Sequence, residues 1–242
     1  ARLLGALGAR VALNGRDVDR LRATHAELRA EGVEAIYEAG DVTSKEDMQR
    51  LISSAESLFG SIDVLINNAG ISMRGPFGDL DEALARKVTE VNVVGSVIPT
   101  VAALPKVVER KGSIVFISSA AGLRGFPNVS IYSASKMALT ALAESLDAEL
   151  HDAGVHVGIL YLGFTENDPD KEIFDASGGR IRITRSSQHT QRQAAEAILQ
   201  AIRKRKRRAV FTSQGKVLSL AHRLAPRLVD WAVRRAQVHS SR

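Results

Sequence analysis

Short apolar runs alternate along the chain with longer patterns of amphipathic helix. The apolar runs cover residues 11–13, 34–37, 62–66, 113–117, 155–160 and 209–212, and the helical patterns cover residues 17–30, 43–59, 84–109, 132–152 and 191–205. Strands that are apolar on both faces and separated by helices are typical of a parallel sheet covered by helices. Because crossovers between parallel strands are right-handed, the pattern predicts an α/β, doubly wound fold with ligands at the carboxyl ends of the strands.

The composition is that of an ordinary globular protein, with 45% hydrophobic and 25% charged residues among 242. We expect one domain, residues 1–212, followed by an extension, residues 213–242. The chain has no cysteine, which excludes disulfides and thiol nucleophiles and suits a reducing compartment, so we expect a cytoplasmic protein. The histidines lack the spacing of metal ligands, so no metal site is expected: His25, His151, His156, His189, His222 and His239.

Candidate chemistry centres on Tyr132 and Lys136, which lie four residues apart on a predicted helix and therefore share a face. A neighbouring ammonium favours the phenolate and lowers the pKa of a tyrosine, so the pair is a candidate general acid/base. Ser119 ends the predicted strand 113–117, and Asn92 interrupts an apolar helix where a polar residue is disfavoured. The alternatives are a solvated Tyr–Lys pair and simple capping roles for Ser119 and Asn92.

In order and spacing, these residues resemble the short-chain dehydrogenase/reductase family over nearly all of residues 1–212. The matching pieces are DVT at 41–43, NNAG at 67–70, Asn92, Ser119 and YSASK at 132–136. The resemblance implies a Rossmann-like fold and an NAD(P)-dependent oxidoreductase that transfers a hydride between nicotinamide and a small-molecule carbonyl or secondary alcohol. It also implies a homodimer or homotetramer, paired through the helices that contain Asn92 and Tyr132.

The resemblance also implies a role for each residue. Tyr132 would donate the proton in reduction or accept it in oxidation, and Lys136 would lower the pKa of Tyr132 and hold the nicotinamide ribose. Ser119 would hydrogen-bond the substrate oxygen, and Asn92 would keep a water in line for proton relay. The remaining cofactor contacts implied by these motifs are Asp41, Val42, Asn68, Ala69 and Gly70.

Two further segments bear on the cofactor. Arg16 follows the strand at residues 11–13, where a guanidinium binds the 2′-phosphate of NADP, so we expect NADP, with NAD as the second option. After the strand at 155–160 the chain has Gly163, Thr165 and Asn167 where the family usually has Pro-Gly and then a Thr. Gly163 keeps the turn, and Thr165 or Asn167 would meet the carboxamide.

The first strand and the glycine-rich phosphate loop of the family have no counterpart in this sequence, which opens on a helical pattern. That strand is central in a doubly wound sheet, so we expect roughly 15–25 residues before Ala1 in the natural chain. Residues 166–190 mix apolar and charged side chains and are expected to form a lid hinged at Gly178-Gly179.

The basic charge is confined to the end of the chain. Residues 201–242 hold 12 lysines and arginines against one acid, Asp230, a net charge of +11, whereas residues 1–200 carry −5. Nucleic-acid binding is not expected, since aromatic residues for stacking are few. The sequence contains no run of about 18 uninterrupted apolar residues, so no transmembrane helix is predicted.

The extension reads as a basic amphipathic helix that Pro226 should kink or split. Its apolar positions either pack on the body or a partner subunit, or make peripheral contact with an anionic membrane. A second function class also stays open, a non-catalytic nucleotide-sensing or membrane-surface protein on the same fold. The complete set of Asn92, Ser119, Tyr132 and Lys136 favours the enzyme.

Overall fold

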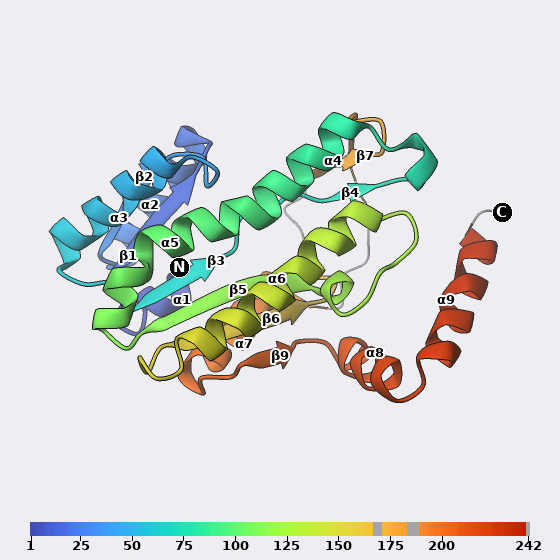
Figure 1. Ribbon diagram of the computed structural model, residues 1–242. Helices are drawn as coiled ribbons and strands as arrows, with labels where there is room; N and C mark the ends of the chain where they lie inside the picture. Colours follow the sequence, from blue (N-terminus) through green and yellow to red (C-terminus); the bar gives the residue numbers. More distant parts are fainter. Residues whose placement is uncertain (167–170, 183–188, 241–242) are drawn as a thin grey trace.

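The computed structural model describes residues 1–166, 171–182 and 189–240 and has alternating strands and helices (Figure 1). The strands are β1 (Val11–Gly15), β2 (Ala35–Ala39), β3 (Val64–Asn67), β4 (Met73–Arg74), β5 (Ser113–Ser119), β6 (His156–Leu162), β7 (Glu172–Asp175), β8 (Arg180–Arg182) and β9 (Arg208–Val210). The α-helices are α1 (Arg2–Gly5), α2 (Val18–Ala30), α3 (Lys45–Phe59), α4 (Glu82–Thr89), α5 (Gly95–Glu109), α6 (Ser130–Glu149), α7 (Gln191–Arg203), α8 (Ser213–Leu224) and α9 (Pro226–Ser240).

The helix ends follow the local sequence. Asp17 caps α2 by accepting from the backbone N–H of Arg20, and Ser44 caps α3 in the same way. Gly60 ends α3 in the left-handed conformation, at a φ of 77°, which glycine adopts without steric cost. Pro226 separates α8 from α9 and confirms the predicted split.

The core lies on both faces of a four-stranded parallel sheet in the order β3-β5-β6-β9. On one face Ile114 and Phe116 of the central strand β5 pack with Ala103 of α5 and Leu139 of α6. On the other face Val115 and Ile117 pack with α7. Successive residues of a strand point to opposite faces, so helices on both sides explain why β5 is apolar at every position from Ile114 to Ile117.

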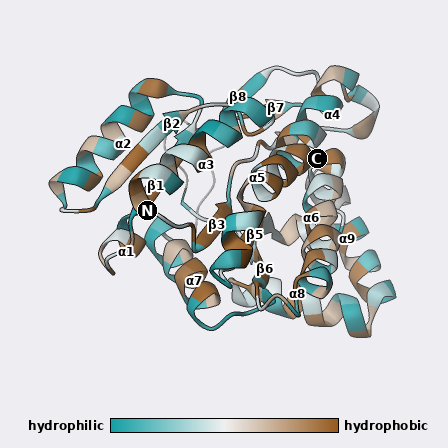
Figure 2. Cartoon of the chain, turned by 60° about the vertical axis from the view of Figure 1, so that its left-hand side comes forward, coloured by the Kyte–Doolittle hydropathy of each residue, from teal (hydrophilic) through white to brown (hydrophobic). Residues whose placement is uncertain are grey.

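A second parallel pair, β1-β2, lies beside this sheet and packs on α2 (Figure 2). Among the described residues β1 forms strand pairing only with β2. Strand β3, at the edge of the four-stranded sheet, pairs only with β5. No described strand therefore pairs with both sheets, and helix α3 connects them by packing on β2 and on α5. The expected central strand before Ala1 stays a prediction.

The segment expected to be a lid contains a small sheet. Strands β7 and β8 form an antiparallel hairpin, and β7 also pairs in parallel with β4. Gly178 has a φ of 91° inside the hairpin turn, where the Asp175 carboxylate accepts hydrogen bonds from the Gly179 N–H and the Ser177 hydroxyl. Ala176 is buried against α4. The expectation of a hinge at Gly178-Gly179 is therefore wrong, because a tight, hydrogen-bonded turn occupies these positions.

The helical run Glu82–Glu109 is the one stretch of described residues that is long and apolar enough to cross a membrane by length and composition. Within the fold its α5 part packs against α3 and on strands β3 and β5. Its apolar character is therefore used in the core.

Candidate active site

The predicted catalytic residues meet at the carboxyl ends of β3 and β5. Ser119 is the last residue of β5, and Asn68-Ala69-Gly70 follow β3 as exposed loop residues. The first turn of α6 brings Tyr132 to the same edge, and Lys136 follows one turn later. This is the edge where a doubly wound sheet places its ligands.

The side chain of Ser119 lies close enough to the Tyr132 hydroxyl to act on its pKa. The Ser119 hydroxyl also accepts from the N–H of Ala121, 3.3 Å away, at the start of the 3-10 helix η3 (Ala120–Gly122). The capping alternative for Ser119 is thus real, but it coexists with the contact to Tyr132. Because the backbone holds Ser119 in place, its hydroxyl has a fixed position beside the phenol.

The pKa of Tyr132 is raised above its ordinary value, mainly by burial, while the hydrogen bond from Ser119 acts in the opposite direction. The expectation that Lys136 lowers this pKa is therefore wrong for the protein alone. The Lys136 ammonium lies 6.0 Å from the centre of the Tyr132 ring and donates to the Ile117 carbonyl, 3.0 Å away. At that distance its charge does not outweigh the desolvation of the phenolate.

Lys136 is itself strongly perturbed. The residue is buried, with only 6% of its surface exposed to solvent. Burial, the larger cause, and the positive charge of Lys171 together lower the pKa of Lys136 to about 8. A buried ammonium with a pKa near physiological pH is a group that can gain or lose a proton during a reaction.

Asn92 is fully buried in a π-helical turn, η2 (Glu90–Val94), which joins α4 to α5. Its amide nitrogen donates to the Ile71 carbonyl and to the Ser135 hydroxyl, both at 2.9 Å. Its carbonyl oxygen accepts from the Ile71 N–H at 2.8 Å. Single π-helical turns often occur at functional sites. The bonds to Ile71 fix the chain directly after the NNAG segment.

Gly70 shows how closely these groups are packed. A methyl group at this position would lie 3.1 Å from Oδ1 of Asn92 and 3.3 Å from Nζ of Lys136. A side chain here would press on both functional groups. Glycine therefore keeps the space above Asn92 and Lys136 open to a ligand.

The expected adenosine-binding residues also meet, at the carboxyl ends of β1 and β2. The Arg16 guanidinium lies 3.7 Å from the Asp41 carboxylate, and both side chains are exposed. Hydrogen bonding from the Thr43 N–H, the largest cause, lowers the pKa of Asp41 and keeps the carboxylate ionised. Val42 packs closely on Gly95, where a methyl group would lie 2.6 Å from Cγ2 of Val42.

The segment after β6 is only partly described. Gly163 packs against Thr212, because a methyl group at position 163 would lie 2.5 Å from Cγ2 of Thr212. Thr165 is half-buried, and Asn167 lies outside the described residues.

Three contributors have weak sequence signals. Ser135 is a small residue inside the YSASK motif, and its acceptance of a bond from Asn92 follows only from the fold. Ile117 acts through its main-chain carbonyl, which no side-chain pattern reveals. Lys171 acts through charge from a segment expected to be a lid.

The residues present fit a nicotinamide dinucleotide at its two ends. The open backbone at Gly70, beside a buried ammonium and a tyrosine hydroxyl, suits a ribose and a flat ring, and Arg16 with Asp41 suits the adenosine ribose. Among the described residues no glycine-rich turn precedes β1 to receive the pyrophosphate.

Comparison with known proteins agrees with this geometry. Residues 1–178 match the family model described as short chain dehydrogenase. The chain is 36% identical over 220 residues to the mouse dehydrogenase/reductase SDR family member 7B, covering 88% of this chain and 68% of the mouse protein. A short-chain dehydrogenase from Streptomyces avermitilis superposes with a TM-score of 0.80 and 26% identity, covering 97% of this chain and 91% of that one. An actinorhodin polyketide ketoreductase with NADPH superposes with a TM-score of 0.66 and 36% identity, covering 69% of this chain and 65% of that one.

The chain therefore belongs to the short-chain dehydrogenase/reductase family of NAD(P)-dependent oxidoreductases.

Proposed function

We propose that this protein interconverts a ketone and a secondary alcohol, with Tyr132 as the general acid/base. The observation that carries the proposal is the placement of the Ser119 and Tyr132 side chains beside one another at the end of β5, one helical turn from the buried Lys136. A binding module has no use for a pair of hydroxyls held beside a desolvated ammonium.

The raised pKa of Tyr132 keeps the phenol protonated near neutral pH, which suits proton donation to a carbonyl during reduction. Ser119 donates its hydroxyl hydrogen to the same substrate oxygen and orients it towards Tyr132. Once Tyr132 has given up its proton, the nearby ammonium of Lys136 stabilises the phenolate. Bound NAD(P)H supplies the hydride.

For the cofactor we propose a preference for NADP over NAD. Arg16 is exposed at the carboxyl end of β1, where its guanidinium can pair with a 2′-phosphate. One oxygen of the Asp41 carboxylate accepts hydrogen bonds from Thr43, and the other oxygen lies 3.7 Å from the Arg16 guanidinium. The ketoreductase with NADPH is a structural neighbour that binds this cofactor.

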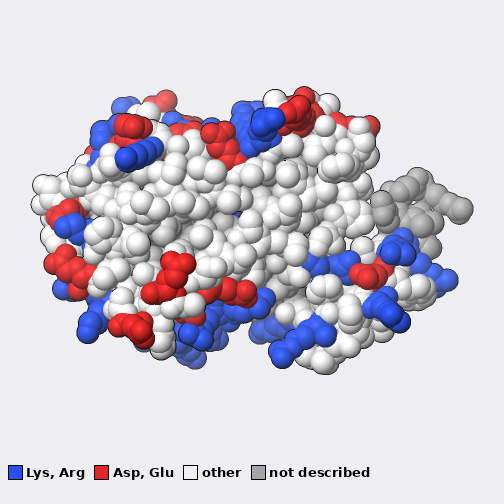
Figure 3. Space-filling model, in the orientation of Figure 1, with Lys and Arg blue, Asp and Glu red and all other residues white. Residues whose placement is uncertain are grey.

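We also propose a homodimer or homotetramer that pairs through α5 and α6. Val94 at the end of η2, Val101 of α5 and Met137 of α6 are exposed apolar residues, and Val101 is 65% exposed. Figure 3 shows a wide area with no charged side chains across the middle of this face, over the two helices. An uncharged apolar surface of this kind is typical of an interface between subunits.

The test is the variant Tyr132→Phe, with Tyr37→Phe as the matched control on β2. Carbonyl compounds are first screened for NADPH consumption by the wild-type protein. Loss of the general acid should lower kcat by about 100-fold or more, while the affinity for NADPH changes less than about twofold. The control should keep full activity. If Tyr132→Phe retains more than about a tenth of the wild-type kcat, Tyr132 is not the acid/base.

A further inference from the structure

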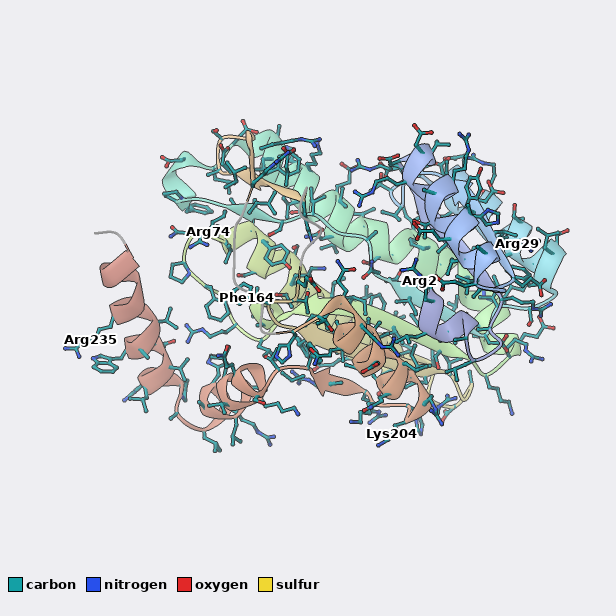
Figure 4. The ribbon with its side chains drawn as sticks, turned by 180° about the vertical axis from the view of Figure 1, so that it is seen from behind. Arg2, Arg29, Arg74, Phe164, Lys204 and Arg235 are labelled. Atoms are coloured by element: carbon teal, nitrogen blue, oxygen red, sulfur yellow. The ribbon has the colours of Figure 1, made fainter. Side chains whose placement is uncertain are left out.

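The two C-terminal helices carry a set of exposed apolar side chains, here called the tail strip: Val217, Leu220 and Leu224 of α8 and Leu228 and Trp231 of α9. Each of these residues is between 53% and 72% exposed. Of the apolar positions noted in the sequence of this extension, these five do not pack on the body, whereas Leu218 and Ala221 are half-buried. Figure 4 shows α9 at the outer edge of the molecule, with the side chain of Arg235 pointing outward from it.

The spacing puts the apolar side chains of each helix on one face. Steps of three and four residues separate Val217, Leu220 and Leu224, and a step of three separates Leu228 and Trp231. Cations border this face on both helices: Lys216 and Arg223 on α8, and Arg227 and Arg234 on α9. The Arg235 guanidinium stacks 4.6 Å from the centre of the Trp231 ring.

The opposite side of this helix pair is fixed to the body. Thr212 caps α8 by accepting from the Gly215 N–H at 3.0 Å, and Val229 of α9 is only 8% exposed. The Asp230 carboxylate accepts a hydrogen bond from Arg124 at 3.1 Å. Because the helices are held from behind, the tail strip is presented to solvent as an ordered surface.

The charge of this surface is one-sided. Asp230 is the single acidic residue between residues 201 and 242, and its carboxylate pairs with Arg124 of the body, so the side-chain charge of this segment is strongly positive. Apolar side chains bordered by cations, with a tryptophan among them, are complementary to an anionic lipid surface. A second copy of the tail would meet it with the same positive charge.

We propose that α8 and α9 dock this protein on a bilayer that contains anionic phospholipid, with the tail strip buried in the headgroup region. The binding is peripheral, and the cations of both helices contact the lipid phosphates and carboxylates.

The experiment uses Trp231, the only tryptophan of the chain, as its own probe. The full protein is mixed with vesicles of phosphatidylcholine alone or with about one-third phosphatidylserine, and tryptophan fluorescence and co-sedimentation are measured. We expect a blue shift and binding with phosphatidylserine, and binding at least about tenfold weaker with phosphatidylcholine alone or in about 0.5 M salt.

The matched variants separate the tail strip from apolar surface in general. Leu220→Glu with Leu224→Glu should abolish vesicle binding, whereas Leu7→Glu with Leu58→Glu, two exposed leucines elsewhere, should leave it unchanged. Circular dichroism shows that both proteins are folded. Equal binding by the two double variants, no blue shift of the wild type with phosphatidylserine, or a concentration-dependent blue shift without vesicles would each overturn the proposal. The last result would mark an interface between copies.

Discussion

Replacing Lys136 by methionine should change how the stability of the protein depends on pH. Burial lowers the pKa of Lys136 from 10.5 to about 8, so the folded state disfavours the charged ammonium. A pKa lowered by this amount costs about 3 kcal/mol of folding stability near neutral pH, where the lysine is charged in both states. Between the folded and the unfolded pKa the unfolded chain binds more protons. The contribution of Lys136 to the free energy of unfolding therefore rises as the pH increases between these two pKa values.

The magnitude is large enough to measure. Between about pH 7 and about pH 9.5 the wild type should gain about 2 kcal/mol from Lys136, and Lys136→Met should lack this gain. At about pH 7 the variant loses the hydrogen bond to the Ile117 carbonyl, which costs about 1–3 kcal/mol. This loss offsets much of the stability that the variant gains by no longer burying a charged ammonium. The pH dependence is thus the sharper readout.

The assay is urea unfolding followed by circular dichroism at both pH values, with Lys45→Met as the control at an exposed lysine. The control should follow the wild type. Identical pH dependence in the wild type and in Lys136→Met would show that Lys136 has an ordinary pKa and would refute the reasoning.

Three further variants test the cofactor end, the π-helical turn and the oligomer. Arg16→Ala should weaken binding of NADPH by about tenfold or more and leave NADH binding nearly unchanged, as measured by fluorescence titration; equal losses would exclude a role in phosphate recognition. Asn92→Ala removes three hydrogen bonds and should lower the free energy of unfolding by about 2–4 kcal/mol in urea, whereas exposed Asn68→Ala should change it by less than about 0.5 kcal/mol. Val101→Glu should reduce the mass measured by light scattering to that of the monomer, and an unchanged mass would place the interface elsewhere.

The order of strands and helices could be predicted because each element is long enough to show its period, and caps such as Asp17 and Ser44 are local signals. The β7-β8 hairpin could not, because three or four residues show no period and β7 pairs with β4 about a hundred residues earlier. The predicted catalytic residues do meet around Tyr132, and Arg16 and Asp41 meet at the ends of β1 and β2. The direction of its pKa shift was wrong, because burial depends on packing that no spacing reveals.

The π-helical turn at Asn92 also restricts how the chain can vary in length. Such a turn holds about one residue more than an α-helical turn, so deleting one residue would restore a regular helix while rotating one half by about 100° against the other. One half carries Leu84 and Val88 into the cluster around Met73, and the other carries Val107 into the core of the main sheet. This packing fixes the rotation of each half of the helix about its axis. A single-residue insertion or deletion anywhere between these two anchoring points should therefore be far less tolerated than most substitutions there.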